Sequence, residues 1–192
     1  MGLLSRLLGG RRGATERTRF SIIAHVAFEG AIHVTEAPVG AAWEYDEDER
    51  DGDGYWAMTL KYILPEAPSP LALLAKIYTI KRGFQRPALP GASDWRESLG
   101  PLYAEITSLA AQPAIQTTMK GTTLTAVEAN VDGPRAEAGA PLRIRERRAV
   151  LNEELFIVTA MGTPEQFAAH ASDIDRWFST VAFVPLAESK PR

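Results

Sequence analysis

The sequence predicts an α+β domain in which helices flank an antiparallel β-sheet, and two adjoining features indicate this class. Residues 142–150 and 155–161 are rich in β-branched and aromatic side chains, and Leu151-Asn152-Glu153-Glu154 separates them as a hairpin turn would. Thr163-Pro164-Glu165-Gln166 then carries a capping box with proline at the first helical position. We expect a sheet of about six to eight strands, covered by the Thr163 helix and by residues 93–109.

Length and composition indicate one globular domain. The chain has 192 residues, of which 45% are hydrophobic and 23% charged. We place the domain at residues 20–186, after a flexible basic segment at 1–19 and before a tail at 187–192. The chain has no cysteine, which excludes disulfides and thiolate chemistry and fits a reducing compartment, so we expect a cytoplasmic location.

The first 19 residues carry five arginines against one glutamate, and four leucines precede Gly9-Gly10. The apolar run is too short for a secretory signal, and no small-residue cleavage site follows it. A frayed tail is the favoured interpretation. The alternative is a weak contact of residues 1–12 with a membrane surface through a short amphipathic helix.

Residues 20–35 alternate as a hairpin would. A three-residue turn at Glu29-Gly30-Ala31 would set Phe28 opposite Ile32 and keep the apolar face together. The other face would then carry His25 and His33, but no third ligand is evident, so we expect no metal site and no cofactor.

Residues 42–64 predict a second hairpin around an acidic turn. Residues 44–53 hold seven acids against one arginine. An EF-hand alignment fails, because Leu60 falls where the bidentate glutamate belongs. Asp51-Gly52 and Asp53-Gly54 explain the segment as a solvated hairpin tip.

Prolines bracket residues 65–90 and predict a crossover. A helix starting at Ser69-Pro70 fits the spacing of Leu71, Leu74 and Tyr78, although the β-branched run at 77–80 leaves its second half ambiguous. Residues 93–109 predict a helix in two pieces, because Gly100-Pro101 breaks the run. Residues 117–131 predict a hairpin around Lys120-Gly121, and a polar loop should follow to Pro141.

The helix that starts at Thr163 should present one apolar face to the sheet. Phe167, Ala171, Ile174 and Phe178 recur at helical spacing, and Trp177 widens the stripe. We therefore expect Phe167, Ile174 and Phe178 to be buried.

Arg143, Arg145 and Arg147 are the candidate binding residues. Strand alternation puts all three on one face, about 6 to 7 Å apart. Such a stripe suits a phosphate, an anionic lipid surface or an acidic protein. The favoured alternative is that carboxylates of neighbouring strands neutralise it. An open face would support binding, and an acid beside each guanidinium would make the stripe structural.

No catalytic signature is present: the sequence has no nucleophile elbow, zinc-protease motif, P-loop or dinucleotide fingerprint. We therefore predict no catalytic residue. Nucleic acid is not expected as a partner, because the net charge is −3 and no DNA- or RNA-binding motif occurs.

The last 40 or so residues resemble the closing hairpin, helix and short strand of the Mog1/PsbP-like superfamily. The resemblance rests on the hairpin residues 147–160, on Thr163-Pro164-Glu165-Gln166-Phe167, and on the segment 174–183. It implies a sandwich of an antiparallel sheet with flanking helices and a non-catalytic role. Members of that superfamily serve as Ran-binding factors, photosystem subunits and bacterial chaperones of secreted effectors, and no functional residue of theirs transfers here.

The preferred function is thus a non-catalytic, chaperone- or adaptor-like protein that binds another protein, of which an acidic one is a candidate. The alternative is a small-molecule binder or enzyme with its site between sheet and helix. An exposed apolar groove would favour the first class, and a deep polar pocket with converging titratable groups the second.

Overall fold

The computed structural model describes residues 20–23, 30–34, 42–50, 55–64, 70–80, 92–119, 122–137, 139–151 and 154–185. The predictions for residues 1–19, His25, the turn dipeptides at residues 51–54 and the tail 187–192 lie outside these residues. The strands are β1 Phe20–Ile23, β2 Gly30–Val34, β3 Ala42–Arg50, β4 Tyr55–Leu64, β5 Leu71–Ile80, β6 Ser108–Ala111, β7 Ile115–Met119, β8 Thr122–Pro134, β9 Pro141–Leu151, β10 Glu154–Gly162 and β11 Val181–Pro185. The helices are α2 Ala92–Leu99, the 3-10 turn η3 Gly100–Leu102, α3 Pro164–Ala169 and α4 Ala171–Thr180.

The fold is α+β with one large antiparallel sheet, as predicted. In the described part the sheet has 11 strands in the order β1-β2-β11-β7-β8-β9-β10-β5-β4-β3, with β6 beside β8. This is more than the six to eight that we expected. The link between β7 and β11 is parallel, and the other pairs are antiparallel.

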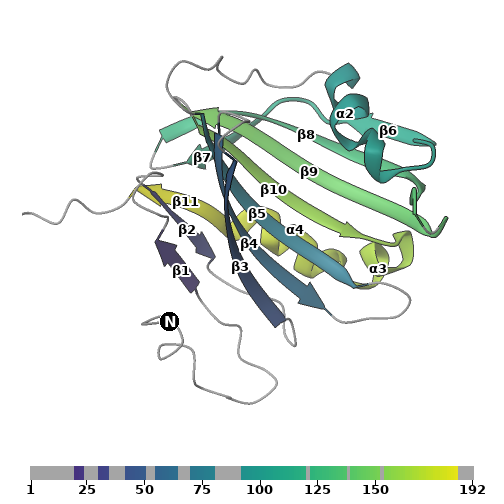
Figure 1. Cartoon of the computed structure of the whole chain (residues 1–192), viewed down its shortest axis with the longest axis horizontal. Helices are drawn as coiled ribbons and strands as arrows, with labels where there is room; N and C mark the ends of the chain where they lie inside the picture. Colours follow the sequence, from purple (N-terminus) through teal and green to yellow (C-terminus); the bar gives the residue numbers. More distant parts are fainter. Residues whose placement is uncertain are drawn as a thin grey trace, which may run out of the picture.

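Helices lie on both faces of this sheet (Figure 1). On the α4 face, Tyr62, Phe156 and Val158 are buried together with Ile174, Trp177 and Phe178 of α4. The Tyr62 and Trp177 rings meet edge to face, with centroids 5.3 Å apart. On the α2 face, a second core joins Trp95 and Leu99 of α2 to Tyr103, Ala129, Val131, Leu142 and Ile144. The sheet therefore separates two apolar layers.

The hairpins at residues 42–64, 117–131 and 142–161 form as predicted, except that in the first of them residues 46–50, expected in the acidic turn, belong to β3 and pair with β4. In the hairpin at residues 117–131 Met119 pairs with Thr122, and in the hairpin at residues 142–161 Leu151 pairs with Glu154. Two residues therefore separate the paired strand ends in both of these hairpins. The register expected for the first hairpin is wrong, because Phe20 pairs with Val34 and Ile22 with Ile32. This shift changes the length of the connection but still pairs apolar residues with each other, so side-chain pattern alone could not distinguish the two registers.

Two predicted helices are wrong. Residues 71–80 form the interior strand β5, paired with both β4 and β10. Leu71, Leu73, Leu74 and Ala75 are all buried, and an apolar run buried on both faces has no period that separates strand from helix. The second piece of the 93–109 segment shrinks to η3, after which the chain extends into β6. Hydrogen bonds from Ala104 N to Pro134 O and from Thr107 N to Asp132 O fasten this extended segment to β8.

The capping box at Thr163 is present as predicted. Gln166 N donates to Thr163 Oγ1 at 3.2 Å, and Thr163 N donates to Gln166 Oε1 at 2.8 Å. The helix is split at His170 into α3 and α4 rather than continuous. Ile174 and Phe178 are buried as expected. Phe167 is only half-buried and Ala171 is exposed, because the split interrupts the apolar face of the helix.

Candidate functional site

The three predicted arginines lie on the α4 face of β9, and each meets a carboxylate of β8. Arg143 Nε donates to Asp132 Oδ1 at 2.6 Å, and its Nη2 to Asp132 Oδ2 at 3.3 Å. Arg145 Nε donates to Glu128 Oε1 at 2.7 Å, and Arg147 Nε to Glu128 Oε2 at 2.8 Å. The register explains these pairs, because Glu128 lies opposite Arg147 and Asp132 opposite Arg143.

The helices complete the environment of these arginines. Arg145 Nη1 donates to Asp175 Oδ1 of α4 at 2.7 Å, and Arg147 Nη1 to the carbonyl oxygen of Phe178 at 2.7 Å. A cation is favourable near the carboxyl end of a helix, where carbonyl groups lack helical partners. The guanidinium groups of Arg145 and Arg147 also lie 4.2 and 5.2 Å from the centroid of the Phe178 ring, within the range of cation–π attraction.

The arginine stripe does not form an open cationic face. Each guanidinium of the stripe has an acid of a neighbouring strand within salt-bridge distance, and three carboxylates face three arginines. This is the arrangement favoured from the sequence, in which carboxylates of neighbouring strands neutralise the stripe. We therefore do not propose that an acidic protein or an anionic membrane binds to the stripe as an open surface.

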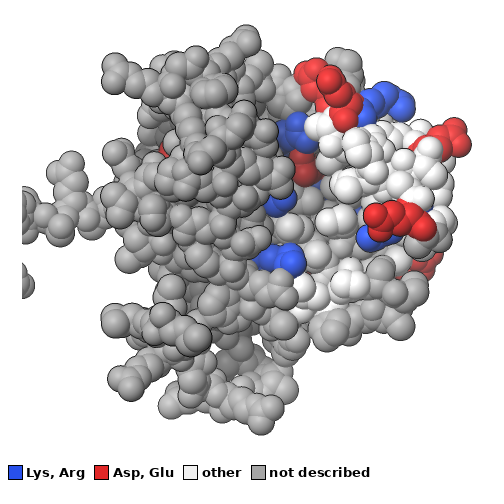
Figure 2. Space-filling view, in the orientation of Figure 1, with Lys and Arg blue, Asp and Glu red and all other residues white. Residues whose placement is uncertain are grey.

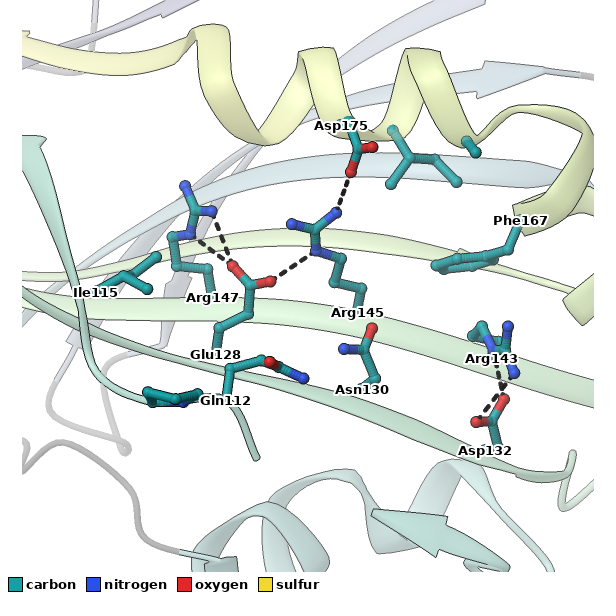
Figure 3. A pocket seen from close by; sticks show the side chains of 13 residues that line it. Gln112, Ile115, Glu128, Asn130, Asp132, Arg143, Arg145, Arg147, Phe167 and Asp175 are labelled. Carbon is teal, nitrogen blue, oxygen red and sulfur yellow. Dashed lines mark hydrogen bonds and ion pairs between the residues drawn. The ribbon is translucent and has the colours of Figure 1, made fainter. Parts of the chain in front are cut away.

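A cavity nevertheless opens beside the stripe, and we call it the arginine pocket (Figure 3). Its volume is about 690 Å³. Figure 3 shows the arginines and acids of the strands on one side and α3 and α4 on the other. The lining residues are Gln112, Pro113, Ile115, Glu128, Asn130, Asp132, Arg143, Arg145, Arg147, Phe167, Ala171, Ile174 and Asp175.

The opposite face carries a second ionic cluster, which was not predicted from the sequence. Arg148 Nε donates to Glu146 Oε1 at 2.6 Å, and Thr159 Oγ1 donates to Glu146 Oε2 at 3.1 Å. Arg148 Nη2 donates to Ser98 Oγ at 2.8 Å, and its guanidinium lies 4.1 Å from the centroid of the Trp95 ring. Strand alternation could have placed Arg148 with Glu146 on this face. It could not have supplied Ser98 or Trp95, which come from α2.

Beside this cluster the surface is hollowed into a groove of about 500 Å³, which we call the α2 groove. Figure 2 shows largely uncharged surface on this side of the described part of the molecule, with charged groups around it. The polar and charged residues in its lining are Lys76, Ser98, Glu146, Arg148 and Thr159. The apolar ones are Leu74, Leu99, Pro101, Leu102, Ile144, Leu155, Ile157 and Met161.

The described residues contain no group of three His, Asp or Glu side chains that could hold a metal ion. His33 lies in β2, opposite Ser21 and Ala182, while its predicted companion His25 is outside the described part. Among the helices that are described, none is long and apolar enough to cross a membrane.

No protein-family model matches this chain, and no curated protein sequence does either. Several solved structures are similar to this chain, and two of them are as follows. LpqN, involved in cell envelope biogenesis of Mycobacterium tuberculosis, has 11% identity and a TM-score of 0.43, with 76% of this chain and 86% of that chain covered. PA94 from Pseudomonas aeruginosa, a protein of unknown function, has 15% identity and a TM-score of 0.38, with 88% and 98% covered. We draw no functional inference from similarity at this level.

Proposed function

We propose that this chain is a non-catalytic cytoplasmic protein that binds an apolar segment of another protein in the α2 groove. The observation that carries the proposal is the lining of the groove, in which eight of the 13 side chains are apolar. Leu102 at its edge is 41% exposed, and it is the one large hydrophobic residue that is exposed in the described part. Apolar surface gathered in a groove is typical of a site where an apolar side chain of a partner is buried.

The charges in the groove suggest what the partner carries. Glu146 and Arg148 pair with each other, which leaves Lys76 as the lining charge without an ion-pair partner among the described residues. A segment that places an acid beside its apolar side chains would therefore complement the groove, because Lys76 can meet that acid at the rim.

The resemblance of the last 40 or so residues to the Mog1/PsbP-like superfamily supports the same class of function. We propose the sandwich architecture of that superfamily for this chain as part of the hypothesis. The capping box at Thr163 and the hairpin of β9 and β10 are compatible with it. No residue role is transferred.

The test uses peptides of about 12 residues selected from a random display library on the intact chain. Leu102→Asp should weaken binding of the selected peptides at least tenfold, because a carboxylate would then face apolar side chains. Lys76→Glu should slow the association of acidic peptides and reverse its dependence on salt, because attraction is replaced by repulsion. Ala168→Asp is the matched control, since Ala168 is exposed on α3 at the other face of the sheet.

Circular dichroism should show that all three variants are folded, since Leu102 and Ala168 are exposed and Lys76 is half-buried. Peptides that bind the native chain, Leu102→Asp and Lys76→Glu equally well would overturn the proposal. Loss of binding in Ala168→Asp alone would place the site on the other face.

A further inference from the structure

The arginine pocket has the size and mixed lining of a ligand site. Its volume of about 690 Å³ lies within the range of roughly 300 to 1,000 Å³ that is common for small-molecule sites. Most of its polar groups come from the sheet, Asp175 comes from α4, and Ile115, Phe167 and Ile174 are apolar. A ligand can bind only to those polar groups whose existing ion pairs are not needed to stabilise the fold.

Most of the ion pairs in the pocket cannot be exchanged for a ligand. Glu128 has a side chain that is 7% exposed and accepts from both Arg145 and Arg147, so removing it would leave two cations uncompensated. Arg143 and Asp132 form a two-point pair between neighbouring strands. These groups form the fixed floor of the pocket.

The pair between Arg145 and Asp175 is different. The Asp175 side chain is 73% exposed, so its attraction to Arg145 is screened by water and is weak. Asp175 can turn into solvent at little cost, and the carboxylate of a ligand can then take its place on Nη1. The exchange leaves no buried charge unpaired, because Glu128 still holds Nε of Arg145.

Arg145 is held ready for such a ligand. Glu128 fixes its Nε, and the Phe178 ring lies 4.2 Å from its guanidinium carbon. No described residue accepts a hydrogen bond from its Nη2, so the Nη1 and Nη2 edge can offer two parallel donors, the geometry that matches a carboxylate. Asn130 lies opposite Arg145 on β8, and its side chain points into the pocket (Figure 3).

The charge balance selects a monoanion. With Asp175 in place, three arginines face three acids in the lining, and the sum is zero. When Asp175 turns out, three arginines face Glu128 and Asp132, which leaves one positive charge. A single carboxylate restores neutrality, whereas a dianion would add an uncompensated charge.

We propose that the arginine pocket binds a small organic monocarboxylate, with Arg145 as its anchor, Asp175 as the group that it displaces, and Phe167 and Ile174 against its apolar body. This site is independent of the α2 groove, because Arg145 and Arg147 line the pocket while the alternate residues Glu146 and Arg148 of β9 line the groove on the opposite face.

Benzoate is the probe, titrated into the intact chain at constant ionic strength and followed by nuclear magnetic resonance shifts. We expect millimolar binding, with the largest shifts at Asn130, Arg145 and Asp175. Phthalate, a dianion of similar shape, should bind at least several-fold more weakly. No saturable shift up to 100 mM benzoate, or shifts centred away from the pocket, would overturn the proposal.

Two variants of α4 separate displacement from a general charge effect. Asp175→Asn removes the competitor of the ligand and should tighten benzoate binding about two- to five-fold, the gain that a weak exposed pair predicts. Asp173→Asn removes the same charge from the same helix outside the pocket and should leave binding unchanged. Equal gains in both variants, or no gain in Asp175→Asn, would contradict the proposal.

Arg145→Lys keeps the charge but loses the planar fork, and binding should weaken at least tenfold. If this variant fails to fold, the Asp175→Asn and Asp173→Asn pair decides alone. Lys76→Glu, which alters the α2 groove, should bind benzoate like the native chain. Loss of benzoate binding in Lys76→Glu would contradict two independent sites.

Discussion

Glu128 neutralises the centre of the arginine stripe. Its side chain is 7% exposed, and its two oxygens accept hydrogen bonds from Arg145 and Arg147. It is placed by strand register, since β8 sets it opposite Arg147. Asp175 touches the same arginine from α4 but is 73% exposed. The two carboxylates lie at equal distance from the Arg145 guanidinium but differ in how much they stabilise the fold. Water screens the attraction of the exposed Asp175 more than that of the buried Glu128.

Glu128→Gln should lower the free energy of unfolding by about 3 to 5 kcal/mol, because it removes the shared counter-charge of two partly buried guanidinium groups. Asp175→Asn, the control at the same arginine, should cost less than about 1 kcal/mol. Urea denaturation at neutral pH measures both. Equal losses in the two variants would show that Glu128 is not the main counter-charge of the stripe.

The extended segment after η3 lies unusually close to β8. Tyr103 Oη donates to the carbonyl oxygen of Val131 at 3.0 Å, and burial raises the pKa of that phenol. Where the segment crosses Gly133, a Cβ atom would collide with the carbonyl oxygen of Glu105 and lie 2.9 Å from Tyr103 Cδ1. The approach requires glycine at this position of the strand. This contact helps to explain why residues 103–107 leave the helical conformation that the sequence predicts.

Gly133→Ala should destabilise the fold by about 1 to 3 kcal/mol, because the backbone of residues 103–105 must move away from β8. Gly100→Ala is the matched control, since a Cβ atom there meets nothing within 4 Å, and it should change stability by less than about 0.5 kcal/mol. Thermal unfolding followed by circular dichroism compares them. Similar melting temperatures would mean that the segment does not pack on Gly133 in solution.

The two faces of the sheet carry different kinds of site. The α4 face combines the arginine pocket with an apolar layer in which Phe178 is 3% exposed and supports two guanidinium groups. The α2 face combines its own core with the apolar groove. One sheet can support both because alternate residues of each strand point to opposite sides.

Phe178→Ala should cost about 3 to 5 kcal/mol, since it empties a buried aromatic site and removes the ring beneath Arg145 and Arg147. Leu102→Ala, at the exposed edge of the α2 groove, should cost less than about 1 kcal/mol. Guanidinium denaturation gives both values. A loss below about 1 kcal/mol for Phe178→Ala would reject its place in the core.

The sequence predicted some elements well and others wrongly, for identifiable reasons. The hairpin of β9 and β10 and the helix start at Thr163 depend on turn residues and a capping box within a few positions, so they could be recognised locally. Residues 71–80 could not be recognised as a strand in this way. The strand β5 lies between β4 and β10, and its apolar side chains are not confined to one face. Phe167 was expected to be buried, but the break at His170 leaves it at the wall of the pocket.

The sequence by itself determined the α+β class, the positions of three hairpins and the placement of Arg143, Arg145 and Arg147 on one face. Each of these follows from alternation and turn chemistry over short stretches of chain. Only the tertiary structure decided that Glu128 and Asp175, 17 and 30 residues away from Arg145, would meet that arginine. The neutralisation of the stripe and the two cavities depend on strand register and helix placement, which join residues that no local pattern connects.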